Sequence, residues 1–217
     1  DFGLGSAHVK FFQDTAYSAS QVIDPEELDA RCEAVAESRE PLKLTHFGRL
    51  EFYKGMHHAI EAVARVNGAA KLTLIGTGTE EQALRQLVDR LGVEDLVEFV
   101  PPMSYGDEFL NRVREQDLLI APSLAPDTPR SAWDAIASGL PILAYDTEYY
   151  EQLRDKTGAV ATVPWGDVQA LADAVNGFAD DRPKVEAMKR GTREVALDNT
   201  QERWIARRVA WTEALFE

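Results

Sequence analysis

The sequence has few cysteines, few basic residues and no long apolar run, and each shortage excludes a class of protein. Its single cysteine, Cys32, cannot form an internal disulfide, and its helical neighbourhood with Leu28 and Val35 predicts a buried structural thiol. No stretch approaches the roughly 18 apolar residues that span a bilayer, and residues 1–10 lack a secretion signal. We therefore expect a globular domain in the cytoplasm, either free or at the inner face of the membrane.

Basic residues are outnumbered by acidic ones, and the formal net charge is −14. Proteins that bind nucleic acid hold the phosphate backbone with clustered Lys and Arg side chains, which this chain mostly lacks. The acidic excess is expected to form a solvated surface. An anionic ligand would therefore need a local group of cations.

Short apolar runs alternate with longer amphipathic segments between residues 42 and 163, which is typical of strand and helix units on a parallel sheet. The predicted strands are residues 42–48, 71–76, 96–100, 117–121, 141–145 and 158–163. The predicted helical stripes that face the sheet are Met56, Ile60, Val63 and Val66 in one helix and Ala83, Leu87 and Leu91 in the next. Gly55 is expected to open the first of these helices and Gly92 to close the second. The fold class is α/β, a Rossmann-like parallel sheet of about six strands flanked by helices.

Both ends of the chain follow a different pattern. After Pro164 the sequence predicts helices only, at residues 167–179, 183–197 and 201–216. The last one carries an apolar stripe that we expect in the core or against another domain: Trp204, Arg208, Trp211 and Leu215. Before the sheet we expect a strand at residues 8–12 and a helix at residues 25–37.

Open parallel sheets bind ligands beyond the carboxyl ends of their strands, so the loops there are the candidate site. The first loop holds Gly48 and Arg49, and Lys54 follows at the start of a helix. Two cations beside a helix N-terminus favour a diphosphate, because the free amides and the helix dipole add to the side-chain charges. The alternative is that both cations are ordinary exposed charges.

Two further loops are candidates for contacts through the backbone. Gly76 and Gly78 permit a tight turn after the second strand, and Thr79 can cap the following helix. Pro101 begins a stiff extended turn that leaves backbone groups free for a nucleobase edge. Each loop could equally be a connection without a ligand.

The loop after the fourth strand holds more polar residues. Asp127 or Thr128 is expected to cap a helix with Pro129 in its first position. Arg130 adds a third cation, and Asp134 lies four residues further along, on the same side of the helix. The alternative is an ordinary surface pair between these two side chains.

In this order, the segments G-R-L…K-G, K-L-x-L-I-G-x-G and A-P-S…DTPR…DAIASGLPI-x-A-Y-D resemble the family-four glycosyltransferases over residues 42–165. The resemblance implies one half of a GT-B fold that binds a nucleoside-diphosphate sugar for retaining transfer without a metal ion. It implies that Arg49 and Lys54 grip the diphosphate and stabilise it as the leaving group. Asp134 takes the place of the family's second Glu, which holds the ribose. Pro126 replaces the first Glu, so Asp127 beside it is the candidate substitute.

The resemblance also implies a partner domain. Residues 1–40 would link a missing N-terminal acceptor domain to a donor domain at residues 41–217, which would be inactive alone. The acceptor would be an unknown glycan, lipid or small molecule. Two other readings stay open: a noncatalytic nucleotide- or protein-binding module, or another GT-B enzyme such as a nucleotide-sugar epimerase or glycogen synthase. No Asp-x-Asp motif is present, so we expect no metal and no cofactor.

Overall fold

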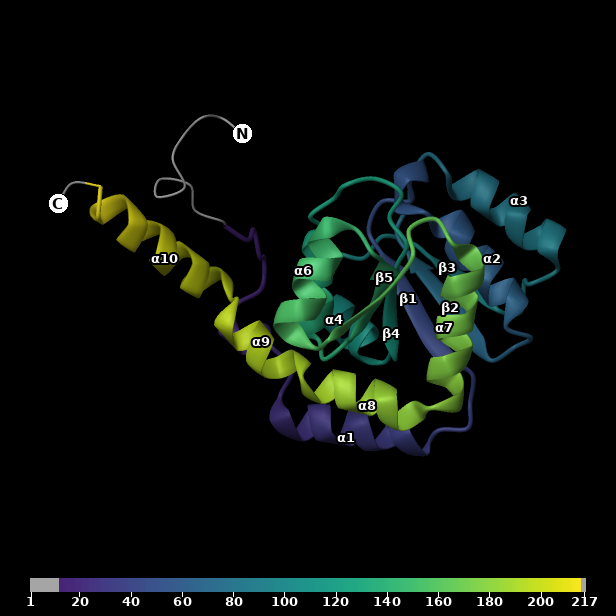
Figure 1. Ribbon diagram of the computed structural model, residues 1–217, viewed down its shortest axis with the longest axis horizontal. Helices are drawn as coiled ribbons and strands as arrows, with labels where there is room; N and C mark the ends of the chain where they lie inside the picture. The colour runs from purple at the N-terminus through teal and green to yellow at the C-terminus, as the bar shows by residue number, and fades with distance from the viewer. Residues whose placement is uncertain (1–11, 216–217) are drawn as a thin grey trace.

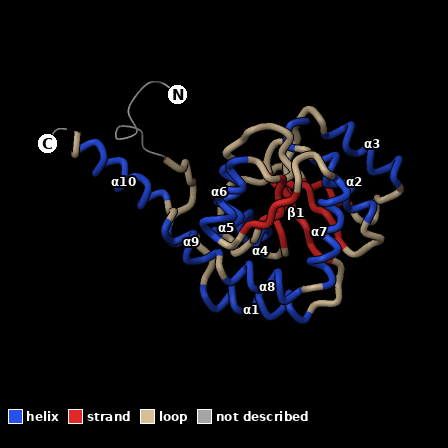
Figure 2. The backbone as a smooth tube through the Cα atoms, in the orientation of Figure 1, coloured by secondary structure: helices blue, strands red, loops and turns tan. Residues whose placement is uncertain are grey.

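The computed structural model describes residues 12–215, which form a six-stranded sheet covered by helices (Figures 1 and 2). The strands are β1 (Leu42–Phe47), β2 (Ala70–Ile75), β3 (Val97–Val100), β4 (Leu118–Ala121), β5 (Ile142–Tyr145) and β6 (Val160–Val163). Their order is β3-β2-β1-β4-β5-β6, and every pair of neighbours is parallel. All six predicted strands are confirmed to within two residues at either end, as is the fold class.

The helices cover both faces of the sheet. They are α1 (Pro25–Glu37), α2 (Met56–Arg65), α3 (Glu81–Leu91), α4 (Asp107–Arg114), α5 (Arg130–Ala137), α6 (Glu148–Thr157), α7 (Val168–Asp180), α8 (Arg182–Arg190), α9 (Thr192–Asp198) and α10 (Gln201–Glu213). Alternate strand residues enter two separate cores: Leu118 and Ile120 pack on the side of α2 and α7, whereas Leu119 and Ala121 pack on the side of α4 and α5. Because both faces are buried, the strands read as continuous apolar runs in the sequence.

Three predicted details of the helices are wrong. The predicted helix at residues 183–197 is divided at Gly191, where the Thr192 hydroxyl donates a 2.7 Å hydrogen bond to the Lys189 carbonyl and competes with the helical hydrogen bonds. On α3 the buried residues are Leu84 and Val88, and Leu87 of the predicted stripe packs against the same core, whereas Ala83 and Leu91 are exposed. Thr79 does not cap α3, because its hydroxyl donates to the Glu51 carboxylate at 2.7 Å.

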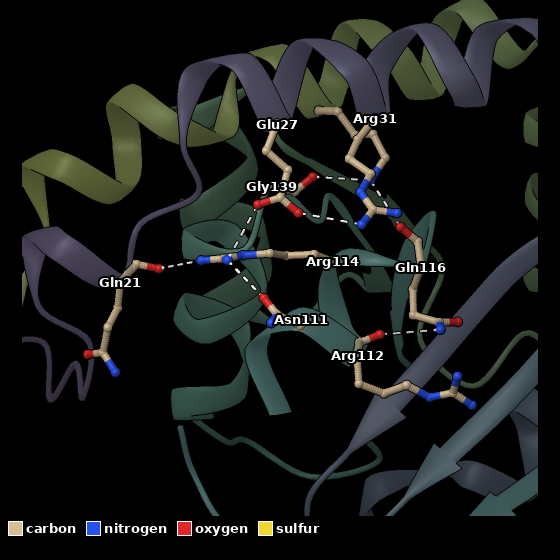
Figure 3. A network of polar contacts seen from close by, with 9 residues as sticks. Gln21, Glu27, Arg31, Asn111, Arg112, Arg114, Gln116 and Gly139 are labelled. Carbon is tan, nitrogen blue, oxygen red and sulfur yellow. Dashed lines mark hydrogen bonds and ion pairs between the residues drawn. The ribbon is translucent and has the colours of Figure 1, made fainter. Parts of the chain in front are cut away.

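The segment before the sheet packs on the same domain. The helix at Pro25–Glu37 is confirmed, and it lies along α8, with Leu28 and Val35 buried and Cys32 fully buried, as predicted for the thiol. Arg114 of α4 ties this segment down by donating to the Gln21 carbonyl at 2.9 Å and pairing with Glu27 (Figure 3). Residues 8–11 of the predicted strand lie outside the described residues, and Phe12 is in irregular chain. The assignment of residues 1–40 as an interdomain linker stays a prediction.

The last helix, α10, extends away from the sheet domain (Figure 1). In the described part of the chain it has no buried residue, so its apolar stripe does not belong to the core of this domain. Trp204 meets the ring of Phe12 edge-on at 5.8 Å. Packing of this helix against another domain stays a prediction. No helix in the described part of the chain combines the length and apolarity needed to cross a bilayer.

Candidate functional site

Two cavities open near the carboxyl ends of the strands, where the sequence predicts the site. The smaller, about 290 Å³, lies beside the loops after β1, β2 and β3. The larger, about 880 Å³, lies beside the loop after β4 and the starts of α5 and α6. The two have no lining residue in common among the described residues, and the predicted site residues that line a cavity divide between them, while Lys54, Gly78 and Pro101 line neither.

The smaller cavity brings together predicted residues from three segments. Its lining includes Gly48 and Arg49 after β1, Gly76 after β2, and Asp134 on α5. The remaining walls are largely apolar and aromatic: Phe47, Ile75, Thr77, Pro102, Met103, Tyr105 and Phe109. An apolar cleft with a few convergent polar groups is typical of a small-molecule site.

Asp134 is the one carboxylic acid among the described residues that line this cavity, and its pKa is raised. Its side chain is buried at 8% exposure, and burial raises the pKa of its carboxyl from about 3.8 to about 6. The Tyr105 hydroxyl donates to it at 3.2 Å and opposes this rise. Near neutral pH, Asp134 is therefore a buried carboxylate with one protein donor and room for another.

Tyr53, which directly precedes Lys54, contacts the side chains of both Arg49 and Lys54. The Arg49 guanidinium donates to the Tyr53 hydroxyl at 3.5 Å, and the Lys54 ammonium lies 5.1 Å from the centre of the Tyr53 ring. The Tyr53 carbonyl accepts a 2.7 Å hydrogen bond from the backbone of Leu124. Tyr53 thus contacts both cations through its side chain and the loop after β4 through its backbone.

Lys54 also forms an ion pair with Asp127, which lies 73 residues further along the chain. The side chains of Lys54 and Asp127 are 15% and 25% exposed, so water screens the pair less than it would a surface pair. Asp127 lines the larger cavity. The ion pair therefore joins the loop at one cavity to the loop at the other.

Gly76 and Gly78 have a structural reason to be glycine. A Cβ on Gly76 would lie 1.9 Å from the carbonyl oxygen of Gly48, and one on Gly78 would lie 2.2 Å from that of Leu50. The loops after β1 and β2 can approach this closely only without these side chains. Gly76 also lines the smaller cavity, whereas Gly78 is not among its lining residues.

The other predicted residues of the α5 start line the larger cavity. Asp127, Thr128 and Arg130 all border it, and Arg130 lies 4.0 Å from Asp14. The predicted cap is wrong, because α5 begins at Arg130 with Pro129 as its N-cap and without a side-chain cap. The side chains of Asp127 and Thr128 are consequently not used to cap the helix.

Sequence reasoning missed Tyr105 and misplaced Pro101. Pro101 is exposed, and its neighbours Pro102 and Met103 line the cavity instead. Tyr105 lies only two residues beyond the Pro-Pro-Met turn, and an aromatic residue so close to a candidate loop could have been predicted to line the site. His46, near the end of β1, is a buried side chain whose Nδ1 lies 3.4 Å from the Ile120 carbonyl, and burial lowers its pKa to about 4.

The residues present do not form an evident metal site. In the ranges that the structure describes, no group of three or more His, Cys, Asp or Glu side chains is placed to hold an ion. The expectation of a metal-independent site stays a prediction.

A sequence model described as "Glycosyl transferases group 1" matches residues 32–195. The chain belongs to this family. Among the curated relatives of this chain, the putative colanic acid biosynthesis glycosyltransferase WcaL of Salmonella typhimurium is 26% identical over 78% of this chain and 44% of its own length. The 2-deoxystreptamine glucosyltransferase of Streptomyces kanamyceticus is 28% identical over 83% of this chain and 51% of its own. The chain thus spans about half the length of these relatives.

Solved structures show the same fold. HepE of Anabaena, in a complex with UDP, superposes with a TM-score of 0.77 at 21% identity over 94% of this chain and 57% of that chain. WaaG, a glycosyltransferase involved in lipopolysaccharide biosynthesis, superposes with a TM-score of 0.72 at 18% identity over 93% of this chain and 55% of that chain. The sheet domain of this glycosyl transferase therefore has the architecture of one half of a GT-B enzyme.

Proposed function

We propose that this chain is the donor-binding half of a retaining glycosyltransferase and that it binds a uridine diphosphate sugar. The observation that carries the proposal is that Arg49 and Asp134, from two segments, line one cavity at the carboxyl edge of the sheet, while Lys54, from the same loop as Arg49, pairs with Asp127 at the other. Among similar structures, Anabaena HepE is described in complex with UDP and with UDP-glucose, which supports the choice of uridine.

In this proposal the smaller cavity takes the nucleoside. The base lies against Met103 and Tyr105, and a ribose hydroxyl donates to the Asp134 carboxylate. The diphosphate extends past Gly48 and Gly76 to Arg49 and Lys54. The sugar then points toward Asp127, Thr128 and Arg130 at the larger cavity, with Asp127 in the role of the missing first Glu.

Catalysis follows from charge that develops during transfer. When the sugar leaves, negative charge accumulates on the diphosphate oxygens, and fixed cations stabilise that state more than the ground state. Arg49 and Lys54 supply this stabilisation, so no metal ion is required. We propose that this chain alone transfers no sugar. It spans about half the length of its relatives and would supply only the donor-binding side of the active site.

Calorimetric titration with UDP, UDP-glucose, GDP, ADP and uridine tests the binding step. We expect saturable binding of UDP, weaker binding of the other two diphosphates, and much weaker binding of uridine, which lacks phosphate. Equal affinity for uridine and UDP would remove the diphosphate contacts from the proposal. A noncatalytic module with the same sheet would bind UDP without preferring UDP-glucose, so that comparison separates the two functions.

A further inference from the structure

The larger cavity is too large to be explained by the donor residues at its edge. Its volume of about 880 Å³ lies near the upper end of the range of about 300–1,000 Å³ found for small-molecule sites. Asp127, Thr128 and Arg130 form one side. Its other walls come from α5, α6 and the turn after β6, which no donor contact uses.

Aromatic side chains form these remaining walls. Trp165, in the turn after β6, is 58% exposed, and Trp133 of α5 is buried at 5% exposure with its indole nitrogen donating to Gln13 at 3.1 Å. Tyr149 of α6 lies beside them, and burial raises its pKa to about 12, so its hydroxyl stays neutral. Flat apolar faces beside neutral hydroxyls suit a ligand that is apolar on one face and polar at its edges.

The polar groups of the cavity are mostly acids. Four carboxylates line it, from Asp14, Asp127, Asp146 and Glu148, against the single guanidinium of Arg130; Asp127 pairs with Lys54 and Asp14 lies 4.0 Å from Arg130, which leaves Asp146 and Glu148 without an ion pair among the described residues. Carboxylates accept hydrogen bonds from hydroxyl or ammonium groups and repel anions. In addition, the buried Thr147 hydroxyl at the start of α6 has no hydrogen-bond partner among the described residues. The cavity therefore favours a ligand rich in hydrogen-bond donors and disfavours a phosphate or carboxylate.

We propose that this cavity binds a neutral or amino-substituted saccharide, with the sugar ring packed on Trp165 and its hydroxyl or ammonium groups donating to Asp146 and Glu148. A lipid chain would leave these carboxylates desolvated without partners, and a nucleoside diphosphate would meet their repulsion. Identifying this saccharide as the acceptor of the transferred sugar rests on the proposed function. The binding itself does not, because none of these contacts involves the nucleotide.

Three hexoses of one ring shape test the proposal: glucose, glucosamine and glucuronate, which are neutral, cationic and anionic near neutral pH. Binding to this chain is measured by saturation-transfer NMR titration, without nucleotide and again in the Arg49→Ala/Lys54→Ala variant. We expect glucosamine and glucose to bind at least about fivefold more tightly than glucuronate, equally well in the variant. A wild-type chain that binds these sugars but not UDP would thus leave this inference standing and count against the donor site.

Substitutions assign the binding to the cavity. Trp165→Ala should weaken glucose binding about fivefold and Trp165→Phe should retain most of it, because the flat ring is kept. Trp211→Ala on α10 is the matched control and should have no effect. Asp146→Asn/Glu148→Gln should raise glucuronate affinity relative to glucose, which damage to the fold would not do. The proposal is overturned if no hexose binds saturably, if glucuronate binds as tightly as glucose, or if Trp165→Ala leaves binding unchanged.

Discussion

Lys54 and Asp127 form an ion pair across the loops after β1 and β4. A diphosphate that binds Lys54 must share this ammonium with the Asp127 carboxylate or displace it. The two proposed donor residues are therefore coupled, and they act on the diphosphate in opposite directions. Asp127 holds Lys54 in place but also repels the anion that Lys54 attracts.

Asp127→Asn should accordingly tighten UDP binding. Removing one partly exposed negative charge near the diphosphate is expected to raise UDP affinity about threefold to tenfold. UDP-glucose should gain less, because its sugar loses the proposed carboxylate contact. Calorimetry with both ligands checks this. The matched control is Asp146→Asn, because Asp146 follows β5, lines the same cavity and does not pair with Lys54. A weaker affinity of the variant for UDP would mean that holding Lys54 outweighs repulsion.

Binding of the donor should depend on the ionisation of Asp134. The folded-state pKa of about 6 lies above the usual value of 3.8, so the folded chain binds more protons between these pH values, and stability falls as pH rises through this window. The carboxylate form accepts the stronger hydrogen bond from ribose. We therefore expect UDP-glucose affinity to rise about fivefold to tenfold between pH 5 and pH 7.

UDP-glucose is the appropriate ligand because its β-phosphate is esterified and has no second ionisation, whereas the terminal phosphate of UDP has a second pKa near 6 that would add its own pH dependence. In Asp134→Asn the rise should disappear and affinity at pH 7 should fall. A pH profile that is the same in Asp134→Asn and the wild type would take Asp134 out of the ribose contact.

Residues before the sheet should be required for stability. A chain that begins at residue 41 exposes the surfaces that Tyr17, Ile23, Leu28 and Val35 cover. Burial of each such side chain contributes about 1.5–3 kcal/mol, a large share of the usual 5–15 kcal/mol of domain stability. Urea denaturation should show a much lower free energy of unfolding. An unchanged value would support a linker that is independent of the domain.

A point variant tests the same contact with less disruption. Arg114→Ala removes the bond to the Gln21 carbonyl and the pair with Glu27, and should cost about 1.5–3 kcal/mol. Arg112→Ala, on the same helix, breaks exposed pairs with Glu98 and Glu115 and should cost less than about 1 kcal/mol. Equal costs would show that Arg114 does not anchor α1.

The sheet could be predicted from the sequence because strands buried on both faces are continuous apolar runs, as in Leu118–Ala121. The sequence also placed Arg49, Gly76 and Asp134 near one edge, since parallel strands end on the same side. The pairing of Lys54 with Asp127 could not be predicted, because it depends on how two loops 73 residues apart approach each other. The division of the predicted residues between two cavities has the same cause.

We expect Arg49 and Lys54 together to bind the diphosphate. Calorimetric titration of Arg49→Ala/Lys54→Ala with UDP and uridine tests this most directly. Each charge-assisted contact contributes about 1.5–3 kcal/mol, so UDP affinity should fall at least about tenfold while uridine affinity hardly changes. The control Lys71→Ala/Arg90→Ala, which removes two exposed cations outside both cavities, should bind UDP like the wild type. If the double variant at Arg49 and Lys54 keeps the wild-type affinity for UDP with its fold intact, the account of the donor site is wrong.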